Sequence, residues 1–188
     1  MVLWDKSEAI VYDVATGGEL ARFIEGRQGF QGDSTAVFDG ERFIVRTFPM
    51  GATVWEVAAS GRTAVLRMPN DTHPDTLTVT PDGAWVVTGD NDSLIRVWNA
   101  RDGRLLQKLA GHSGGIKALA VSPDGRILAS VGQDRVTKLW SLPTGRELMT
   151  LSRDSDISRL RFLPDGQSLL CAHPWRGAHV WRANREPE

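Results

Sequence analysis

Residues 111–151 read GHSGGIKALAVSPDGRILASVGQDRVTKLWSLPTGRELMTL, and this stretch decides the fold. Its apolar residues alternate with polar ones in short segments, a pattern typical of half-buried strands. Between the segments stand turn sequences in which proline fixes φ and glycine accepts a positive φ. The predicted strands are 116–121, 126–131, 136–140 and 146–151, and the turns are 122–125, 132–134 and 142–145. We therefore expect one antiparallel sheet of four strands.

An aromatic residue that ends an apolar segment recurs along almost the whole chain. These residues are Tyr12, Trp55, Trp98, Trp140 and Trp181, at steps of 43, 43, 42 and 41 residues. A period of this length indicates one supersecondary unit repeated several times. The turn sequence PDG recurs as well, at 81–83, 123–125 and 164–166. Short strands joined by tight turns, without a helical period, predict an all-β chain.

The repeated units follow one another without a linker or a low-complexity segment between them. We therefore expect a single domain over residues 1–188. Its units are approximately 1–24 (partial), 35–66, 74–109, 111–151 and 155–182, the last of which lacks its outer strand.

The clearest unit closely resembles a WD-repeat blade. The residues that carry the resemblance are Gly111 and His112 before the first strand, the turn 122–125, Ser130 in the second strand, Asp134 in the next turn, and Trp140 at the end of the third strand. The resemblance implies a β-propeller of four-stranded antiparallel blades. About four to four and a half blades are present, and we expect them to form an open arc or part of a larger ring.

The same resemblance implies a structural role for four polar residues. In WD-repeat blades the corresponding side chains form a buried hydrogen-bond chain, which here would join His112, Ser130, Asp134 and Trp140. A buried indole N–H, hydroxyl and imidazole each need a partner, and a satisfied network makes the blade rigid. The preceding unit keeps part of this tetrad, with the residues Thr88, Asp92 and Trp98.

A serine, a histidine and an aspartate in one unit could also suggest catalysis. A nucleophile needs an exposed oxygen beside a base, in a site that a substrate can enter. Because the resemblance places all three residues inside a core, we expect no catalytic residues and no enzymatic activity.

Composition excludes several classes of function. The 188 residues are 41% apolar and 24% charged, as in globular proteins, and the net charge is −1, so no overall field favours nucleic acid or an anionic membrane. Cys171 is the single cysteine, within an apolar segment, and is expected to be a small core residue. The first residues show no signal peptide, and no apolar run is long enough to span a bilayer. We therefore expect a cytoplasmic protein that binds neither nucleic acid nor membrane.

No metal or cofactor is expected. His173 and His179 lack the cysteine or carboxylate spacing typical of zinc sites, and the segment between them suggests a loop. We therefore expect these histidines not to be metal ligands.

The candidate binding face consists of the turns between second and third strands and the links between units. Its candidate residues are Trp175, Arg176, Arg135, Asp90 and Ser113. Trp175 stands out, because a tryptophan beside an arginine in a turn has the composition of an interface anchor. The alternative is that Trp175 packs over the edge of its blade and compensates for the lost turn aspartate.

The resemblance implies a non-catalytic scaffold for protein–protein interaction, with a protein or peptide partner that the residues do not identify. One alternative is a regulatory or sensor propeller within a larger multidomain protein, linked to a kinase, protease or cytochrome. A catalytic propeller is a further alternative. An open arc would expose the apolar flanks of its end blades, so we also expect either missing N-terminal blades or self-association that completes the ring.

Overall fold

The computed structural model describes the backbone of residues 2–4, 8–12, 19–24, 36–38, 42–46, 52–58, 61–67, 74–153 and 157–183, and the side chains of 74–151 and 157–183. All regular structure in these ranges is β-strand. The described part of the chain therefore contains no helix that could cross a membrane. The prediction of an all-β chain is confirmed.

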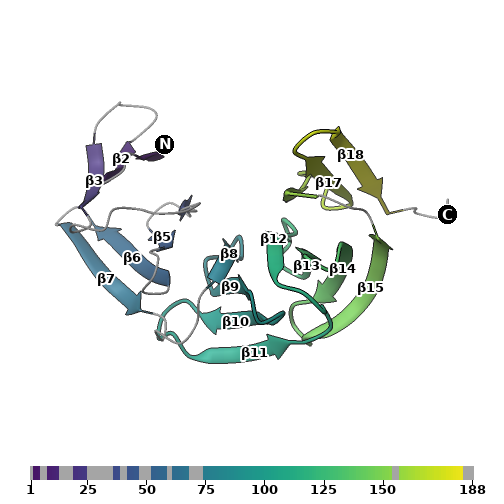
Figure 1. Cartoon of the computed structure of the whole chain (residues 1–188). Helices are drawn as coiled ribbons and strands as arrows, with labels where there is room; N and C mark the ends of the chain where they lie inside the picture. The colour runs from purple at the N-terminus through teal and green to yellow at the C-terminus, as the bar shows by residue number, and fades with distance from the viewer. Residues whose placement is uncertain are drawn as a thin grey trace. The chain divides into compact units, whose positions relative to one another are not determined.

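The chain forms two compact units. The first comprises residues 1–73 with 101–103, and the second comprises 74–100 with 104–188. The single domain expected over 1–188 stays a prediction. Those connections between repeats that lie outside the described ranges also stay a prediction. Figure 1 shows each sheet as neighbouring arrows joined by turns.

The first unit holds two antiparallel sheets among its described residues. The three-stranded sheet has the order β1 (Val2–Trp4), β2 (Glu8–Tyr12) and β3 (Glu19–Ile24). The four-stranded sheet has the order β4 (Ala36–Phe38), β5 (Arg42–Arg46), β6 (Ala52–Ala58) and β7 (Gly61–Arg67). The sequence pattern did not predict β1 and β4, because three residues are too few to show an alternation.

The second unit holds three antiparallel sheets among its described residues. Its first sheet consists of β8 (Pro74–Val79), β9 (Trp85–Asp90), β10 (Ile95–Asn99) and β11 (Leu105–Leu109). The second consists of β12 (Ile116–Val121), β13 (Ile127–Gly132), β14 (Val136–Ser141) and β15 (Arg146–Arg153). The third consists of β16 (Arg159–Phe162), β17 (Ser168–His173) and β18 (Gly177–Arg182).

The PDG turns have the same geometry in all three sheets of the second unit. Gly83, Gly125 and Gly166 have φ of 66°, 73° and 66°, in the left-handed region that favours glycine. Each glycine N–H donates to the carbonyl three residues back, at 2.8–3.0 Å. The turn aspartate accepts a hydrogen bond from a nearby hydroxyl in each case, that of Thr80, Ser122 or Ser168, which holds its pKa below the usual value. The sequence therefore specifies these turns locally.

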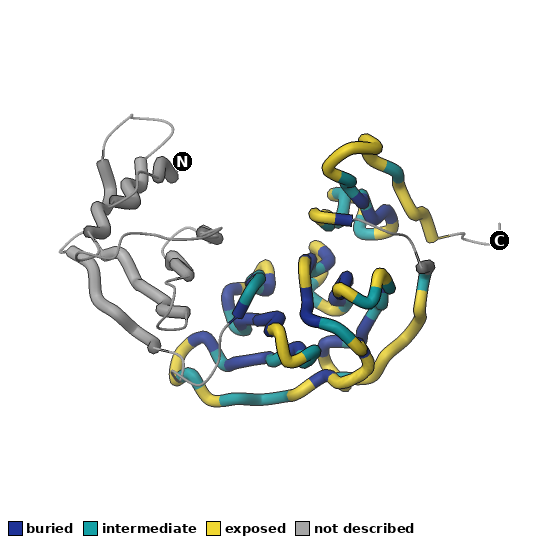
Figure 2. Tube along the Cα trace, viewed as in Figure 1, coloured by how far each residue is buried: buried dark blue, intermediate teal, exposed yellow. Residues whose placement is uncertain are grey.

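The core lies between consecutive sheets of the second unit (Figure 2). One cluster joins Val97 and Leu109 of the first sheet to Leu128 and Trp140 of the second. Another joins Ala129 of the second sheet to Leu169 and Cys171 of the third. Cys171 is fully buried there, which confirms that it is a small core residue.

Candidate functional site

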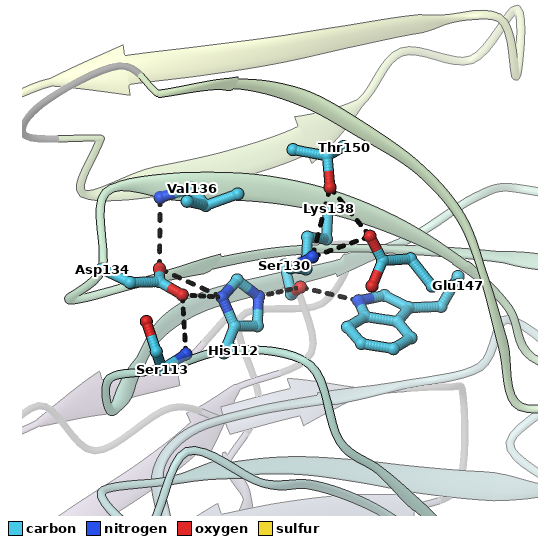
Figure 3. A network of polar contacts seen from close by, with 9 residues as sticks. His112, Ser113, Ser130, Asp134, Val136, Lys138, Glu147 and Thr150 are labelled. Carbon is cyan, nitrogen blue, oxygen red and sulfur yellow. Dashed lines mark hydrogen bonds and ion pairs between the residues drawn. The ribbon is translucent and has the colours of Figure 1, made fainter.

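One chain of hydrogen bonds crosses the second sheet of the second unit and joins His112, Ser130, Asp134 and Trp140 (Figure 3). The imidazole Nδ1 of His112 lies 2.9 Å from Oδ2 of Asp134, and its Nε2 lies 2.7 Å from Oγ of Ser130. The indole Nε1–H of Trp140 donates to the same Oγ at 2.8 Å. The structure thus brings together the four residues that the resemblance connects.

The bonding partners assign the protons in this network. Asp134 is an acceptor, so Nδ1 of His112 carries the hydrogen and donates to it. Ser130 accepts from Trp140 and donates to Nε2 of His112, which is an acceptor in this tautomer. Every polar side-chain atom of this network, from the carboxylate of Asp134 to the indole of Trp140, has a hydrogen-bond partner. The network is therefore satisfied without a ligand.

The carboxylate of Asp134 is also held by the backbone. Its oxygens accept hydrogen bonds from the N–H groups of Ser113, at 2.9 Å, and Val136, at 3.1 Å. Burial opposes ionisation, but these bonds and the bond from His112 together hold the pKa of Asp134 below its usual value. A Cβ on Gly132 would lie 2.6 Å from Oδ1 of Asp134, so the glycine makes room for the carboxylate.

The geometry of this set does not suit nucleophilic catalysis. Ser130 is 0% exposed, and its oxygen is engaged by both Trp140 and His112. A nucleophile must reach a substrate, whereas this hydroxyl lies within a packed sheet. The arrangement supports a structural role for the serine, histidine and aspartate.

The first sheet of the second unit repeats only part of the network. Trp98 donates its indole N–H to Oγ1 of Thr88 at 3.0 Å. Asp92 does not join this pair in any hydrogen bond of the described side chains. Instead its carboxylate accepts from the N–H of Leu94 at 3.1 Å and pairs with the guanidinium of Arg96 at 2.6 Å.

The expectation that Asp90 belongs to an exposed binding face was wrong. Asp90 is 3% exposed and forms an ion pair with Arg96, the same arginine that binds Asp92. Burial raises the pKa of Asp90 to about 6, because desolvation of the carboxylate outweighs the attraction of Arg96. The strand β9 extends to Asp90, so the residue belongs to the sheet and the turn begins after it.

A comparison with protein families identifies the repeat. A family model described as "WD domain, G-beta repeat" matches residues 71–99 and 103–141. The chain contains WD repeats. The matched residues contain most of the first two sheets of the second unit, and the sheets of this WD-repeat protein are blades of a partial β-propeller.

The third blade of the second unit replaces the network of this WD-repeat protein with other contacts. Cys171 stands where Ser130 stands in the preceding blade, when both are counted from the PDG turn. Nε2 of His173 and Nδ1 of His179 lie 2.9 Å apart, and the rings of His179 and Trp181 form a T-shaped contact. Among the described residues, no group of three or more potential ligands forms a metal site. The sequence analysis missed this histidine pair, which the pairing of β17 with β18 produces.

Trp175 lies in the turn between β17 and β18 and is 92% exposed. The alternative that it packs over the blade edge is therefore excluded. Arg176 and Pro174 beside it are also exposed. Gly177, with φ of 79°, closes the turn and pairs with His173 at the end of the ladder.

The remaining candidates, Ser113 and Arg135, are exposed and lie beside the network of the preceding blade. Ser113 donates its backbone N–H to Asp134, and Arg135 follows Asp134 with φ of 64°. The structure therefore places Trp175 and Arg176 on the β17–β18 hairpin and Arg135 on the β13–β14 hairpin. Ser113, from the segment before β12, is bound to the β13–β14 hairpin through Asp134.

Proposed function

We propose that this WD-repeat protein is a non-catalytic scaffold that binds a protein or peptide through the turn Pro174–Gly177, called here the β17–β18 tip. WD repeats are protein-interaction scaffolds in general. The observation that carries the finer proposal is the 92% exposure of Trp175 beside an exposed arginine. Tryptophan and arginine are the residues that most often dominate the binding energy of interfaces.

The corresponding turn residue is bound to groups of its own blade in the other two blades of the second unit. Counted from the PDG turns, Trp175 occupies the place of Asp92 and Asp134. Asp92 is bound to Arg96, and Asp134 is bound to His112 and to two backbone N–H groups. The β17–β18 tip replaces this anchored carboxylate with a large apolar side chain that faces solvent. This substitution supports recognition of something outside the blade.

The chemistry of the tip indicates what a partner must offer. An indole gains most when it enters an apolar pocket, and its N–H needs an acceptor there. The guanidinium of Arg176 favours a carboxylate, which it can bind through two hydrogen bonds. We expect a peptide or protein surface that carries an apolar pocket bordered by an acidic residue. A second copy of the chain is one of the protein partners that such a scaffold can take.

A regulatory or sensor role within a larger multidomain protein would use the same tip. In that case the ligand of the tip would be another segment of the larger protein. For the described residues, the closed network around Ser130 favours either binding role over a catalytic propeller.

Capture experiments with the purified chain as bait test the proposal. The variant Trp175→Ala should lose the captured partner and should unfold at the same temperature as the wild type. Leu148→Ala is a matched control, because Leu148 is an exposed apolar residue on β15 of the preceding blade. If the wild type and Trp175→Ala capture the same proteins in the same amounts, the tip is not the binding site.

A further inference from the structure

The outer face of the third blade is the side of β16–β18 that turns away from the preceding blade. Cα pairing places Arg159, Ala172 and Ala178 in one row across the three strands, and Arg161, Leu170 and Val180 in the next row. Side chains alternate between the two faces of a sheet, so these rows lie opposite Leu160, Cys171 and Phe162. Those three belong to the core shared with the preceding blade, or pack against it. The outer face consists of the two rows and the exposed Arg182.

Arg159 and Arg161 occupy positions that hold small residues in the other blades of the second unit. Arg159 and Arg161 stand six and four residues before the aspartate of their PDG turn. At the same distances the preceding blades have Ala118 with Ala120, and Thr76 with Thr78.

Small side chains allow one blade to approach the next closely. Ala118 and Ala120 are buried, and Ala118 belongs to the core shared with the third blade. At the preceding junction, a Cβ on Gly89 would lie 2.5 Å from Cγ2 of Ile116 in the next blade. Arginines at Arg159 and Arg161 are too long for a junction of this kind unless the covering surface supplies carboxylates.

The outer face has an apolar centre and a basic border. Val180 is 47% exposed, Leu170 is half-buried, and the three arginines are exposed. Residues 157–183 contain four arginines and one aspartate, a net charge of +3. An apolar strip between like charges is a surface that fits an acidic partner with apolar side chains.

The chain itself contains a segment of the complementary charge. Residues 1–25 carry five acidic residues and two basic ones, a net charge of −3, although the whole chain has a net charge of only −1. This segment contains the sheet β1–β3, with strands rich in valine, isoleucine and leucine. An acidic segment and a sheet face bordered by arginines on one chain favour head-to-tail association of two copies.

We propose that the outer face of the third blade binds the acidic N-terminal segment, residues 1–25, of a second copy of this chain. The interface goes beyond the proposed function, because it uses a sheet face and leaves the β17–β18 tip to another partner. Arg159, Arg161 and Arg182 pair with carboxylates of the second copy, and Leu170 and Val180 pack against its apolar side chains. The contact is heterologous, since the two copies contribute different surfaces.

Sedimentation analysis over a series of chain concentrations tests this interface. The wild type should associate at low salt. At high salt its dissociation constant should rise by about tenfold or more, because the ion pairs at the border are screened. The double variant Arg159→Glu with Arg161→Glu should remain monomeric where the wild type associates. Arg126→Glu with Arg146→Glu is the matched control, because both residues are exposed arginines of the preceding blade and the change in charge is identical.

A mixing experiment separates a specific contact from general charge effects. The variant Glu8→Arg with Glu19→Arg reverses charge in the N-terminal segment and should also be monomeric. Mixed with Arg159→Glu/Arg161→Glu, it should associate again, because one variant keeps an intact outer face and the other keeps an intact acidic segment. Circular dichroism should show the same fold in all variants.

Three results would overturn the proposal. A wild type that stays monomeric at low salt excludes the interface, and so does association that survives Arg159→Glu/Arg161→Glu. A mixture of the two reversed variants that stays monomeric excludes the acidic segment as the occupant. Trp175→Ala should associate like the wild type, so failure of the β17–β18 tip as a binding site and failure of this interface are distinguishable.

Discussion

Trp140 donates its indole N–H to the hydroxyl of Ser130 across 2.8 Å, from the third strand of a blade to its second strand. The same bond joins Trp98 to Thr88 at 3.0 Å one blade earlier. In the last blade Cys171 replaces the hydroxyl residue, and Trp181 is 36% exposed where Trp140 is 1% exposed. The strand pairing persists in all three blades, so the bond rigidifies a blade whose fold is already given by its strands.

Replacing Ser130 with alanine should destabilise the protein by about 1–3 kcal/mol, because the indole N–H of Trp140 and Nε2 of His112 would be left buried without a partner. Urea unfolding monitored by circular dichroism measures the change. Ser113→Ala is the control, because that side chain is exposed and the residue binds Asp134 through its backbone N–H. An equal loss in both variants would contradict the role of the network.

Truncation to alanine should cost much more unfolding free energy at a buried tryptophan than at an exposed one. Trp140→Ala removes a fully buried ring and should cost about 3–5 kcal/mol of unfolding free energy. Trp175→Ala removes an exposed ring and should change the unfolding free energy by about 0.5 kcal/mol or less. Thermal melts of both variants measure the contrast, and a large loss for Trp175→Ala would show that the ring packs against the protein.

Gly89→Ala should weaken the junction between the first two blades of the second unit. The added Cβ would lie 2.5 Å from Cγ2 of Ile116 and 2.9 Å from Cγ2 of Thr76, so one blade must shift. Overpacking of this kind costs about 1–3 kcal/mol. In an Ile116→Ala background the same change should cost less, and strict additivity in this double-mutant cycle would contradict the predicted clash.

Asp90 should make the stability of the protein depend on pH near 6. Its pKa is raised to about 6 by burial, so the folded state holds a proton that the unfolded state releases between its own pKa and about 6. The contribution of Asp90 is therefore present at low pH and is lost as the pH rises through about 6. Asp90→Asn should remove this dependence in unfolding curves recorded across that range.

Asp92 provides the opposite control for Asp90. The hydrogen bond from Arg96, assisted by the N–H of Leu94, lowers the pKa of Asp92 although partial burial raises it. Its contribution is present above the unfolded pKa and is lost as the pH falls through the folded one. Asp92→Asn should therefore reduce the loss of stability in acid. It should also move the change near pH 6 to lower pH, because the negative charge of Asp92 helps to raise the pKa of Asp90. A wild-type pH profile without any change near 6 would contradict the assignment to Asp90.

The aromatic repeat marks a structural feature that the sequence analysis did not predict. The strand that carries the aromatic residue shifts register against the next strand of its sheet. The shifts lie between Val11 and Tyr12, Val54 and Trp55, Val97 and Trp98, and Leu139 and Trp140. An extra residue in one strand of a pair bends it and increases its twist. The spacing of the aromatic residues was visible in the sequence, but the shift beside each of them depends on how two strands pair.

Local chemistry allowed the turns and the strands to be predicted. Pro81 with Gly83 and Pro123 with Gly125 restrict the backbone within four residues, so their turns follow from the sequence directly. The tetrad of His112, Ser130, Asp134 and Trp140 was reached through the family resemblance. Its proton assignment needed the observed distances.

The sequence by itself determined that this protein is built from repeated antiparallel sheets, because alternation and turn chemistry act between near neighbours in the chain. Only the tertiary structure decided that Asp90 is buried beside Arg96, that Trp175 faces solvent, and that His173 meets His179. The exposure of a side chain, and its distance from other side chains, depend on which strands lie side by side and which sheet covers them. Residues that look alike in sequence, such as the turn aspartates Asp92 and Asp134, therefore acquire different partners.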